Sequence, residues 1–167
     1  MDWRGWLFGQ LMRVHLCAVG RLRKGPERAL ISDYLGRFGR IGRQLALGPC
    51  LEHEVDERKA SSMSAQAQAL TRVVPDGATV IALDERGDGL NSRDLALYLA
   101  RLRDAGQSDV AFVIGGADGL DPEFRATAQR RISLGTMVWP HMLVRVMLAE
   151  QLYRAATILS GSPYHRD

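Results

Sequence analysis

The sequence VAFVIGGADGLD, residues Val110–Asp121, joins a short apolar run to a glycine-rich turn. The run is rich in strand-forming residues and too short for a helix, which predicts a central strand buried on both faces. Gly115 and Gly116 end the run, and Pro122 stands where the first residue of a helix would fall. A buried strand that leads through glycines into a helix is how α/β proteins build a ligand site at the carboxyl edge of a sheet.

The glycine spacing fits neither a dinucleotide-binding fingerprint nor a P-loop, because G-x-G-x-x-G is absent and no Lys-Ser/Thr pair follows. A plainer interpretation is that the two glycines only end the strand and that Asp118-Gly119 forms a turn. Both interpretations predict the same strand, turn and helix.

Apolar runs and helical spacings alternate along the rest of the chain. Ser92 is the expected N-cap of the helix that we predict at 92–105. A charged, mobile loop is expected at 52–59 and a polar loop at 84–89. We predict strands at 14–19, 45–51, 78–83, 110–114 and 132–134, and helices at 26–38, 61–74, 92–105, 123–131 and 143–159. This order predicts an α/β fold with a mainly parallel sheet and helices on both faces.

Composition is typical of one globular domain: 167 residues, 46% apolar and 25% charged. The net charge is only +3, but arginine carries most of the excess, so nucleic acid is a reasonable partner. Arg21, Arg23 and Lys24 follow the first strand. They form either an ordinary solvated loop or a rim that faces phosphate.

Other classes of protein are disfavoured. Cys17 and Cys50 are too few for a disulfide framework and are expected to be reduced thiols in a cytoplasmic protein. The histidines and cysteines lack zinc-ligand spacing, so no metal is expected, and no apolar run reaches membrane-spanning length. Residues 1–11 lack the apolar segment of a signal peptide, and we interpret them as an extension or a misassigned start before a single domain at 12–167.

Three features near the end of the chain concern partners. Residues 135–140 form an apolar loop, which predicts that a ligand or a second subunit covers it. The helix at 143–159 is apolar over a wide surface, which predicts a homodimer. The tail at 161–167 is polar and, by composition alone, has the character of a frayed terminus.

Three blocks of sequence carry a resemblance to a known family: VIGGADGLDPE at 113–123, ISLGTMVWPHMLVRVMLAEQLYRA at 132–155, and SPYHRD at 162–167. Together they resemble the ribosomal RNA large subunit methyltransferase H family, of the SPOUT class, and the likeness runs from Met12 to Asp167. It implies a carboxyl-terminal trefoil knot. It also implies methyl transfer from S-adenosyl-L-methionine to N3 of a pseudouridine in 23S rRNA, by a homodimer that acts on the assembled ribosome.

The resemblance also implies where the cofactor binds. The contacts carried over by position are Leu83, at the end of ALD, and Gly115, in IGG. The apolar loop would complete the site with Leu134, Gly135, Thr136, Met137, Val138 and Trp139. An apolar loop with free backbone groups suits adenine, whose faces are apolar and whose edges are polar.

The candidate catalytic residues are His165, Arg145, Tyr164 and Arg166. Histidine suits proton transfer near neutral pH, so His165 is a candidate base; the alternative is that it binds phosphate or stacks on a base. Tyr164 and Arg166 suit stacking and phosphate contact. Two other classes stay open on sequence alone, a non-catalytic ribosome-binding module and a flavodoxin-like nucleotide or flavin protein.

Overall fold

The computed structural model describes residues 10–167, so most of the predicted extension, residues 1–9, lies outside the described residues. A five-stranded sheet has the order β2-β1-β4-β3-β5, and every neighbouring pair is parallel. The elements are β1 Met12–Val19, α1 Pro26–Gly42, the short 3-10 helix η2 Arg43–Leu45, β2 Leu47–Val55, α2 Met63–Val73, β3 Thr79–Gly89, α3 Ser92–Asp104, β4 Asp109–Ile114, α4 Pro122–Ala126, β5 Arg130–Ser133 and α5 His141–Ser160.

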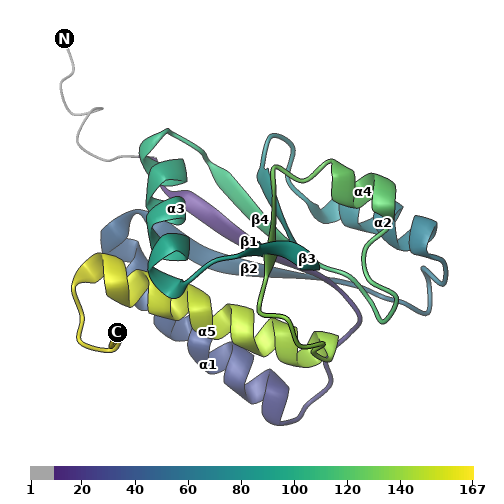
Figure 1. Cartoon of the computed structure of the whole chain (residues 1–167), viewed down its shortest axis with the longest axis horizontal. Helices are drawn as coiled ribbons and strands as arrows, with labels where there is room; N and C mark the ends of the chain where they lie inside the picture. The colour runs from purple at the N-terminus through teal and green to yellow at the C-terminus, as the bar shows by residue number, and fades with distance from the viewer. Residues whose placement is uncertain (1–9) are drawn as a thin grey trace.

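Helices cover both faces of the sheet, as predicted (Figure 1). Helices α1, α3 and α5 pack on one face, where Leu16, Phe38 and Phe112 are almost fully buried. Helices α2 and α4 lie over the other face, in a smaller apolar cluster that includes Leu70 and Val113. All six residues of β4 are buried, because this central strand has helices above and below it.

Strand β2 is longer than predicted, and the expected charged loop at 52–59 is wrong for its first four residues. The segment Glu52–Val55 continues the parallel pairing with β1. Charged residues are tolerated because β2 lies at the sheet edge and its carboxylates have partners. Arg28 donates to Glu52 at 2.7 Å, and the backbone N–H of Leu22 donates to Glu54 at 2.7 Å.

Strand β3 also extends further than predicted, because residues 84–89 form strand and not a loop. Its pairing with β5 is irregular between Leu83 and Asp88, and both of these residues face Ile132. Gly87 passes so close to β5 that an added Cβ would lie 2.7 Å from the backbone nitrogen of Ile132. The backbones of β3 and β5 therefore pass so close to each other at Gly87 that only glycine fits there. The trefoil knot itself stays a prediction.

Two helix boundaries correct the sequence analysis. Helix α4 ends at Ala126 instead of near Arg131, because Gln129 pairs with β3: its backbone N–H donates to the Val80 carbonyl at 3.0 Å, and its side chain accepts from the Val80 N–H at 2.6 Å. β5 can then begin at Arg130. The N-cap of α3 is Asn91, which accepts from the Asp94 N–H at 2.8 Å, and not Ser92.

Helix α5 uses most of its apolar surface inside the chain. Leu148, Ala149, Leu152, Ala155 and Ala156 are buried against the sheet and against α1 and α3 (Figure 1). The sheet together with α1 and α3 therefore covers much of the apolar surface of this helix, and the homodimer stays a prediction. Within residues 10–167, no helix is long and apolar enough to cross a membrane.

Candidate active site

A pocket of about 340 Å³ lies at the carboxyl edge of the sheet. Most of the residues that line it come from β3, from the turn after β4, and from β5 with the loop that follows it. Open α/β sheets commonly bind ligands beyond the carboxyl ends of their strands. The turn Ile114–Leu120 after β4 forms one wall, and the segment Ile132–Trp139 before α5 forms another.

Seven of the eight predicted cofactor residues line this pocket: Leu83, Gly115, Leu134, Gly135, Met137, Val138 and Trp139. Thr136 lies in the same loop but does not line the pocket. His141 and Val144, at the start of α5, complete this side. Segments that are far apart in the sequence therefore meet at one edge of the sheet.

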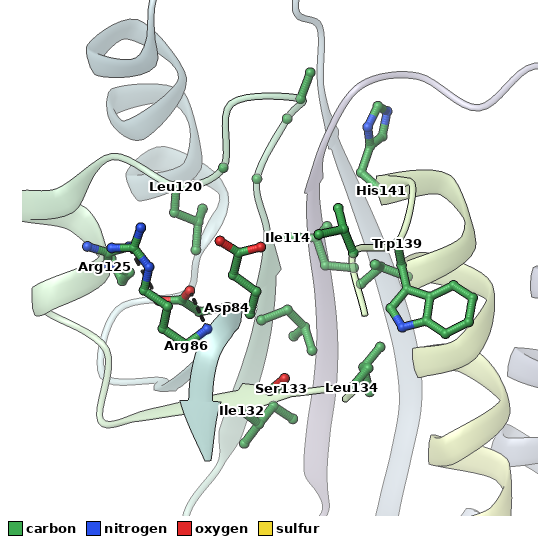
Figure 2. A pocket seen from close by; sticks show the side chains of 18 of the residues that line it. Asp84, Arg86, Ile114, Leu120, Arg125, Ile132, Ser133, Leu134, Trp139 and His141 are labelled. Carbon is green, nitrogen blue, oxygen red and sulfur yellow. Dashed lines mark hydrogen bonds and ion pairs between the residues drawn. The ribbon is translucent and has the colours of Figure 1, made fainter. Parts of the chain in front are cut away.

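One end of the pocket is apolar. Leu134 and Trp139 lie on this side in Figure 2, next to the start of α5. The exposed fractions are 70% for Met137, 82% for Val138 and 40% for Trp139. Large apolar side chains this exposed are costly in water, so the loop presents surface that a ligand or another chain would cover.

The other end of the pocket is charged, and the sequence analysis did not anticipate it. Figure 2 shows Asp84, Arg86 and Arg125 together, opposite Trp139. The Asp84 carboxylate is 3.4 Å from the Arg125 guanidinium, and it accepts a 3.0 Å hydrogen bond from the Arg86 N–H. The Asp84 oxygen that faces Arg125 is buried, and it makes no hydrogen bond with any group of residues 10–167. The position of Asp84 directly after Leu83 was the only available signal, since nothing in the sequence pairs it with Arg125.

Gly115 is required for a reason that the sequence did not reveal. A Cβ on this residue would lie 2.5 Å from the carbonyl carbon of Gly119 and 2.8 Å from the nitrogen of Leu120. The β4–α4 turn folds back over Gly115, so the glycine first makes room for its own loop. Gly115 also lines the pocket, which is a second demand on the same position.

Of the predicted catalytic residues of the tail, His165 lines a different pocket, whereas Tyr164 and Arg166 line neither of the two. His165 and Asp167 line a cavity of about 840 Å³ between α3 and α5. The segment Ile132–Gly135 lines both cavities and therefore separates them. Within one chain, His165 shares this second cavity with Leu134 and Gly135, but it does not line the pocket that the other predicted cofactor residues form.

The tail is folded, which corrects the expectation of a frayed terminus. The rings of Tyr164 and Tyr153 are 4.6 Å apart, and the Tyr164 hydroxyl donates to Glu150 at 3.1 Å. Burial, followed by the hydrogen bond to Glu150, raises the pKa of Tyr164 to about 12, so the phenol stays protonated near neutral pH. Asp167 pairs with Arg93 of α3 at 2.6 Å.

Glu150 and Arg154, one turn apart on α5, form an ion pair at 2.6 Å. Arg154 also contacts Nδ1 of His165 at 3.3 Å, while Nε2 of His165 is 3.1 Å from Asp167. Arg166 is exposed to solvent. The tail therefore holds His165 between a cation and a carboxylate and leaves Arg166 free to contact a partner.

Arg145 lies in neither pocket. Its side chain is 1% exposed, and it donates to the Gly20 carbonyl at 2.9 Å and to Glu54 at 3.2 Å. Arg145 therefore lies behind the β1–α1 loop, and its side chain holds the backbone of that loop at Gly20. No group of His, Cys, Asp and Glu side chains within residues 10–167 has the arrangement of a metal site.

Comparison with known proteins identifies the family of this chain and agrees with its fold. The family described as predicted SPOUT methyltransferase matches residues 12–165. The ribosomal RNA large subunit methyltransferase H of Ruegeria sp. strain TM1040 is 61% identical over 93% of this chain and 99% of its own length. The enzyme of the same name from Dinoroseobacter shibae is 62% identical over the same shares. A crystal structure of a probable methyltransferase from Bordetella pertussis Tohama I has a TM-score of 0.50 at 17% identity, covers 87% of this chain and 95% of its own, and shows likeness of fold alone.

The match over residues 12–165 makes the protein a SPOUT methyltransferase, an enzyme that requires a methyl donor. Because the relatives share more than 60% of aligned residues over almost their whole length, the chain belongs to the ribosomal RNA large subunit methyltransferase H family. This assignment removes the flavin-protein alternative.

Proposed function

We propose that this protein transfers a methyl group from S-adenosyl-L-methionine to N3 of a pseudouridine in 23S rRNA of the assembled ribosome. The observation that carries the proposal is the pocket at the carboxyl edge of the sheet, which seven of the eight cofactor residues expected from the family resemblance line. The names of the relatives supply the substrate class, ribosomal RNA of the large subunit.

The chemistry of the pocket suits the cofactor. Adenine has apolar faces, which match Leu134, Met137 and Trp139 at the apolar end. The methionine portion carries an ammonium and a carboxylate, and the charged end of the pocket offers groups of both signs, the Asp84 carboxylate and the Arg125 guanidinium. The pocket volume lies near the lower end of the range usual for small-molecule sites, roughly 300–1,000 Å³.

Bound S-adenosylmethionine supplies an activated methyl group, so the protein's own task is to align the acceptor nitrogen and remove its proton. We assign the proton removal to His165. Arg154 can only donate, so Nδ1 of His165 accepts and Nε2–H points to Asp167. A ring nitrogen becomes free to take the substrate proton when the long 3.3 Å contact with Arg154 opens.

The other tail residues have supporting roles in this proposal. Tyr164 is held by Tyr153 and Glu150 and fixes the position of His165. The exposed Arg166 contacts an rRNA phosphate. Arg145 is a positioning residue, because it touches neither pocket and acts through the β1–α1 loop.

The protein is proposed to act as a homodimer in the cytoplasm, where its ribosomal substrate lies. We place the dimer contact on the loop before α5 and on the first turn of this helix, and not along its whole length. Five exposed apolar residues gather there: Met137, Val138, Trp139, Met142 and Leu143. A second copy would cover this surface in a closed, symmetric contact.

Methyl transfer from radiolabelled S-adenosylmethionine tests the proposal. Intact ribosomes, separated large subunits and naked 23S rRNA, all from cells lacking this enzyme, serve as substrates. We expect label in the 23S rRNA of intact ribosomes and much less in naked rRNA. Binding of S-adenosylhomocysteine without any transfer would instead favour a non-catalytic ribosome-binding module.

A further inference from the structure

The β1–α1 loop, residues 20–25, carries three cations that the methyl-transfer step leaves without a role. Arg21, Arg23 and Lys24 are all exposed. Asp56 is 3.8 Å from Arg21, whose side chain is 67% exposed, so this pairing neutralises it weakly. In the described part of the chain, no carboxylate forms an ion pair with Arg23 or Lys24. The loop therefore presents its charge to solvent.

The backbone of this loop is held from beneath at two points. Arg145 of α5 donates to the Gly20 carbonyl at 2.9 Å and to Glu54 of β2 at 3.2 Å. The same Glu54 oxygen accepts the N–H of Leu22 at 2.7 Å. Because residues 20 and 22 are fixed, Arg21 and Arg23 project from a loop of defined conformation.

Stability alone does not explain this arrangement. Arg145 is almost fully buried, and its Nε has no hydrogen-bond partner among residues 10–167. A buried ion pair generally stabilises a fold no better than apolar residues of similar volume. The ion pair of Arg145 and Glu54 instead fixes the conformation of the β1–α1 loop.

The loop borders the proposed cofactor pocket. His141 lines that pocket, and its Nε2 lies 3.8 Å from the position of a Cβ on Gly20. Figure 2 shows His141 beside the segment that leaves β1. If a base of a nucleic acid entered the pocket, the phosphate backbone beside that base would therefore lie near the cations of the β1–α1 loop.

We propose that the β1–α1 loop binds phosphates of the rRNA substrate through Arg21 and Arg23, and that Arg145 and Glu54 position it. Arginine suits this task because its planar guanidinium can contact two phosphate oxygens at once. Fixing the loop in advance lowers the entropy lost on binding. The inference rests on the proposed function, since it takes rRNA as the substrate.

The salt dependence of ribosome binding tests this inference. Arg21→Gln/Arg23→Gln is compared with Arg40→Gln/Arg43→Gln, which removes two exposed cations near the far end of α1. Binding to ribosomes and to naked 23S rRNA is measured over a series of salt concentrations. We expect the loop variant to bind roughly tenfold more weakly, with a slope of log K against log salt that is lower by about 1 to 2. The control variant should behave as wild type, and both should keep their affinity for S-adenosylhomocysteine.

The positioning role is tested with Glu54→Gln, which keeps an acceptor for the Leu22 N–H but removes the charge facing Arg145. A lower salt slope with all loop cations present supports positioning, whereas a lower melting temperature with an unchanged slope contradicts it.

Equal slopes for the wild-type protein and the loop variant would overturn phosphate binding, as would equal losses in both double variants. Weaker binding to ribosomes with unchanged binding to naked rRNA would identify a ribosomal protein as the partner and would also overturn it. Methyl transfer by the wild-type protein is measured in parallel. Its absence would contradict the proposed function, while the slopes would still decide the role of the loop.

Discussion

At the residue scale, Gly115 and Gly116 are adjacent in the chain but have different surroundings. A Cβ on Gly115 would meet backbone at 2.5 Å, whereas a Cβ on Gly116 would meet the side chains of Val19 and Gln66 at 3.3 and 3.4 Å. Gly115→Ala must therefore displace the β4–α4 turn, while Gly116→Ala requires only small side-chain shifts. We expect calorimetry to show about tenfold or greater loss of S-adenosylhomocysteine affinity for Gly115→Ala only. Equal affinities of the two variants would contradict this account of the turn.

A second residue-scale prediction concerns Asp109, at the start of β4. Its carboxylate accepts from Arg13 at 2.8 Å and is 2.7 Å from Nε2 of the buried His15. The hydrogen bond from Arg13, and then that from His15, hold the pKa of Asp109 below its ordinary value. Its stabilising contribution is therefore present above the ordinary carboxyl pKa of about 3.9 and is lost as pH falls through the lower folded value.

Asp109→Ala should lower the free energy of unfolding at pH 7 by roughly 1–3 kcal/mol, because it leaves the ring of His15 without this partner. Urea unfolding should show this difference shrinking below about pH 4, as Asp109 of the wild type becomes protonated. Asp104→Ala is the control, since Asp104 is 66% exposed and, in the described part of the chain, forms an ion pair only with its neighbour Arg103. A difference that stayed constant from pH 7 to pH 3 would contradict the assignment.

At the element scale, the tail contributes both to the fold and, by proposal, to the reaction. Truncation after Ser162 removes the packing of Tyr164 on Tyr153 and the pairing of Asp167 with Arg93. The loss should be about 1–2 kcal/mol, which corresponds to a fall of roughly 2–8 °C in melting temperature for a chain of this size. Affinity for S-adenosylhomocysteine should survive, because the tail does not line the cofactor pocket.

Two point variants separate the contribution of the tail to stability from its proposed role in the reaction. His165→Ala should slow single-turnover methyl transfer by roughly 100-fold or more while leaving stability nearly unchanged. Tyr164→Phe keeps the ring but loses the hydrogen bond to Glu150. It should therefore lower the stability of the fold and reduce activity only modestly. Normal single-turnover rates in the truncated enzyme would remove the tail from the mechanism.

How well each element could be predicted depended on where its partners lie in the sequence. The apolar run of β4 and the glycines after it were readable because burial on both faces leaves a local pattern. The second half of β3 was not readable, since its charged and glycine residues form strand only by pairing with β5, more than forty residues later. The same limit applies to the pocket: its apolar loop was visible in the sequence, whereas the contact of Asp84 with Arg125 is created by the fold.

At the scale of the whole molecule, the exposed surface formed by Met137, Val138, Trp139, Met142 and Leu143 predicts a homodimer. Sedimentation at micromolar concentration should give twice the chain mass of 18.5 kDa. Val138→Asp should shift the protein toward the monomer, because a carboxylate buried in the contact would lack a partner. Since Val138 is 82% exposed in the single chain, the fold should be unaffected.

The matched control is Leu97→Asp, which places the same charge on an exposed apolar position of α3, 47% exposed. This variant should remain dimeric. A wild-type protein that sediments only as a monomer would contradict the dimer, and loss of the dimer in both variants would contradict its location.

The central claim is that this chain methylates N3 of a pseudouridine in 23S rRNA of the ribosome, with its cofactor in the pocket between Leu83, Gly115 and the loop before α5. Nucleoside mass spectrometry tests it most directly. Ribosomes from cells lacking the enzyme are incubated with the purified protein and methyl-deuterated S-adenosylmethionine, and their 23S rRNA is digested to nucleosides. We expect one new deuterated nucleoside, a pseudouridine methylated at N3, and much less of it with Gly115→Ala at the same low concentration of cofactor. A deuterated methyl group on any other nucleoside, or none in the rRNA, would contradict it.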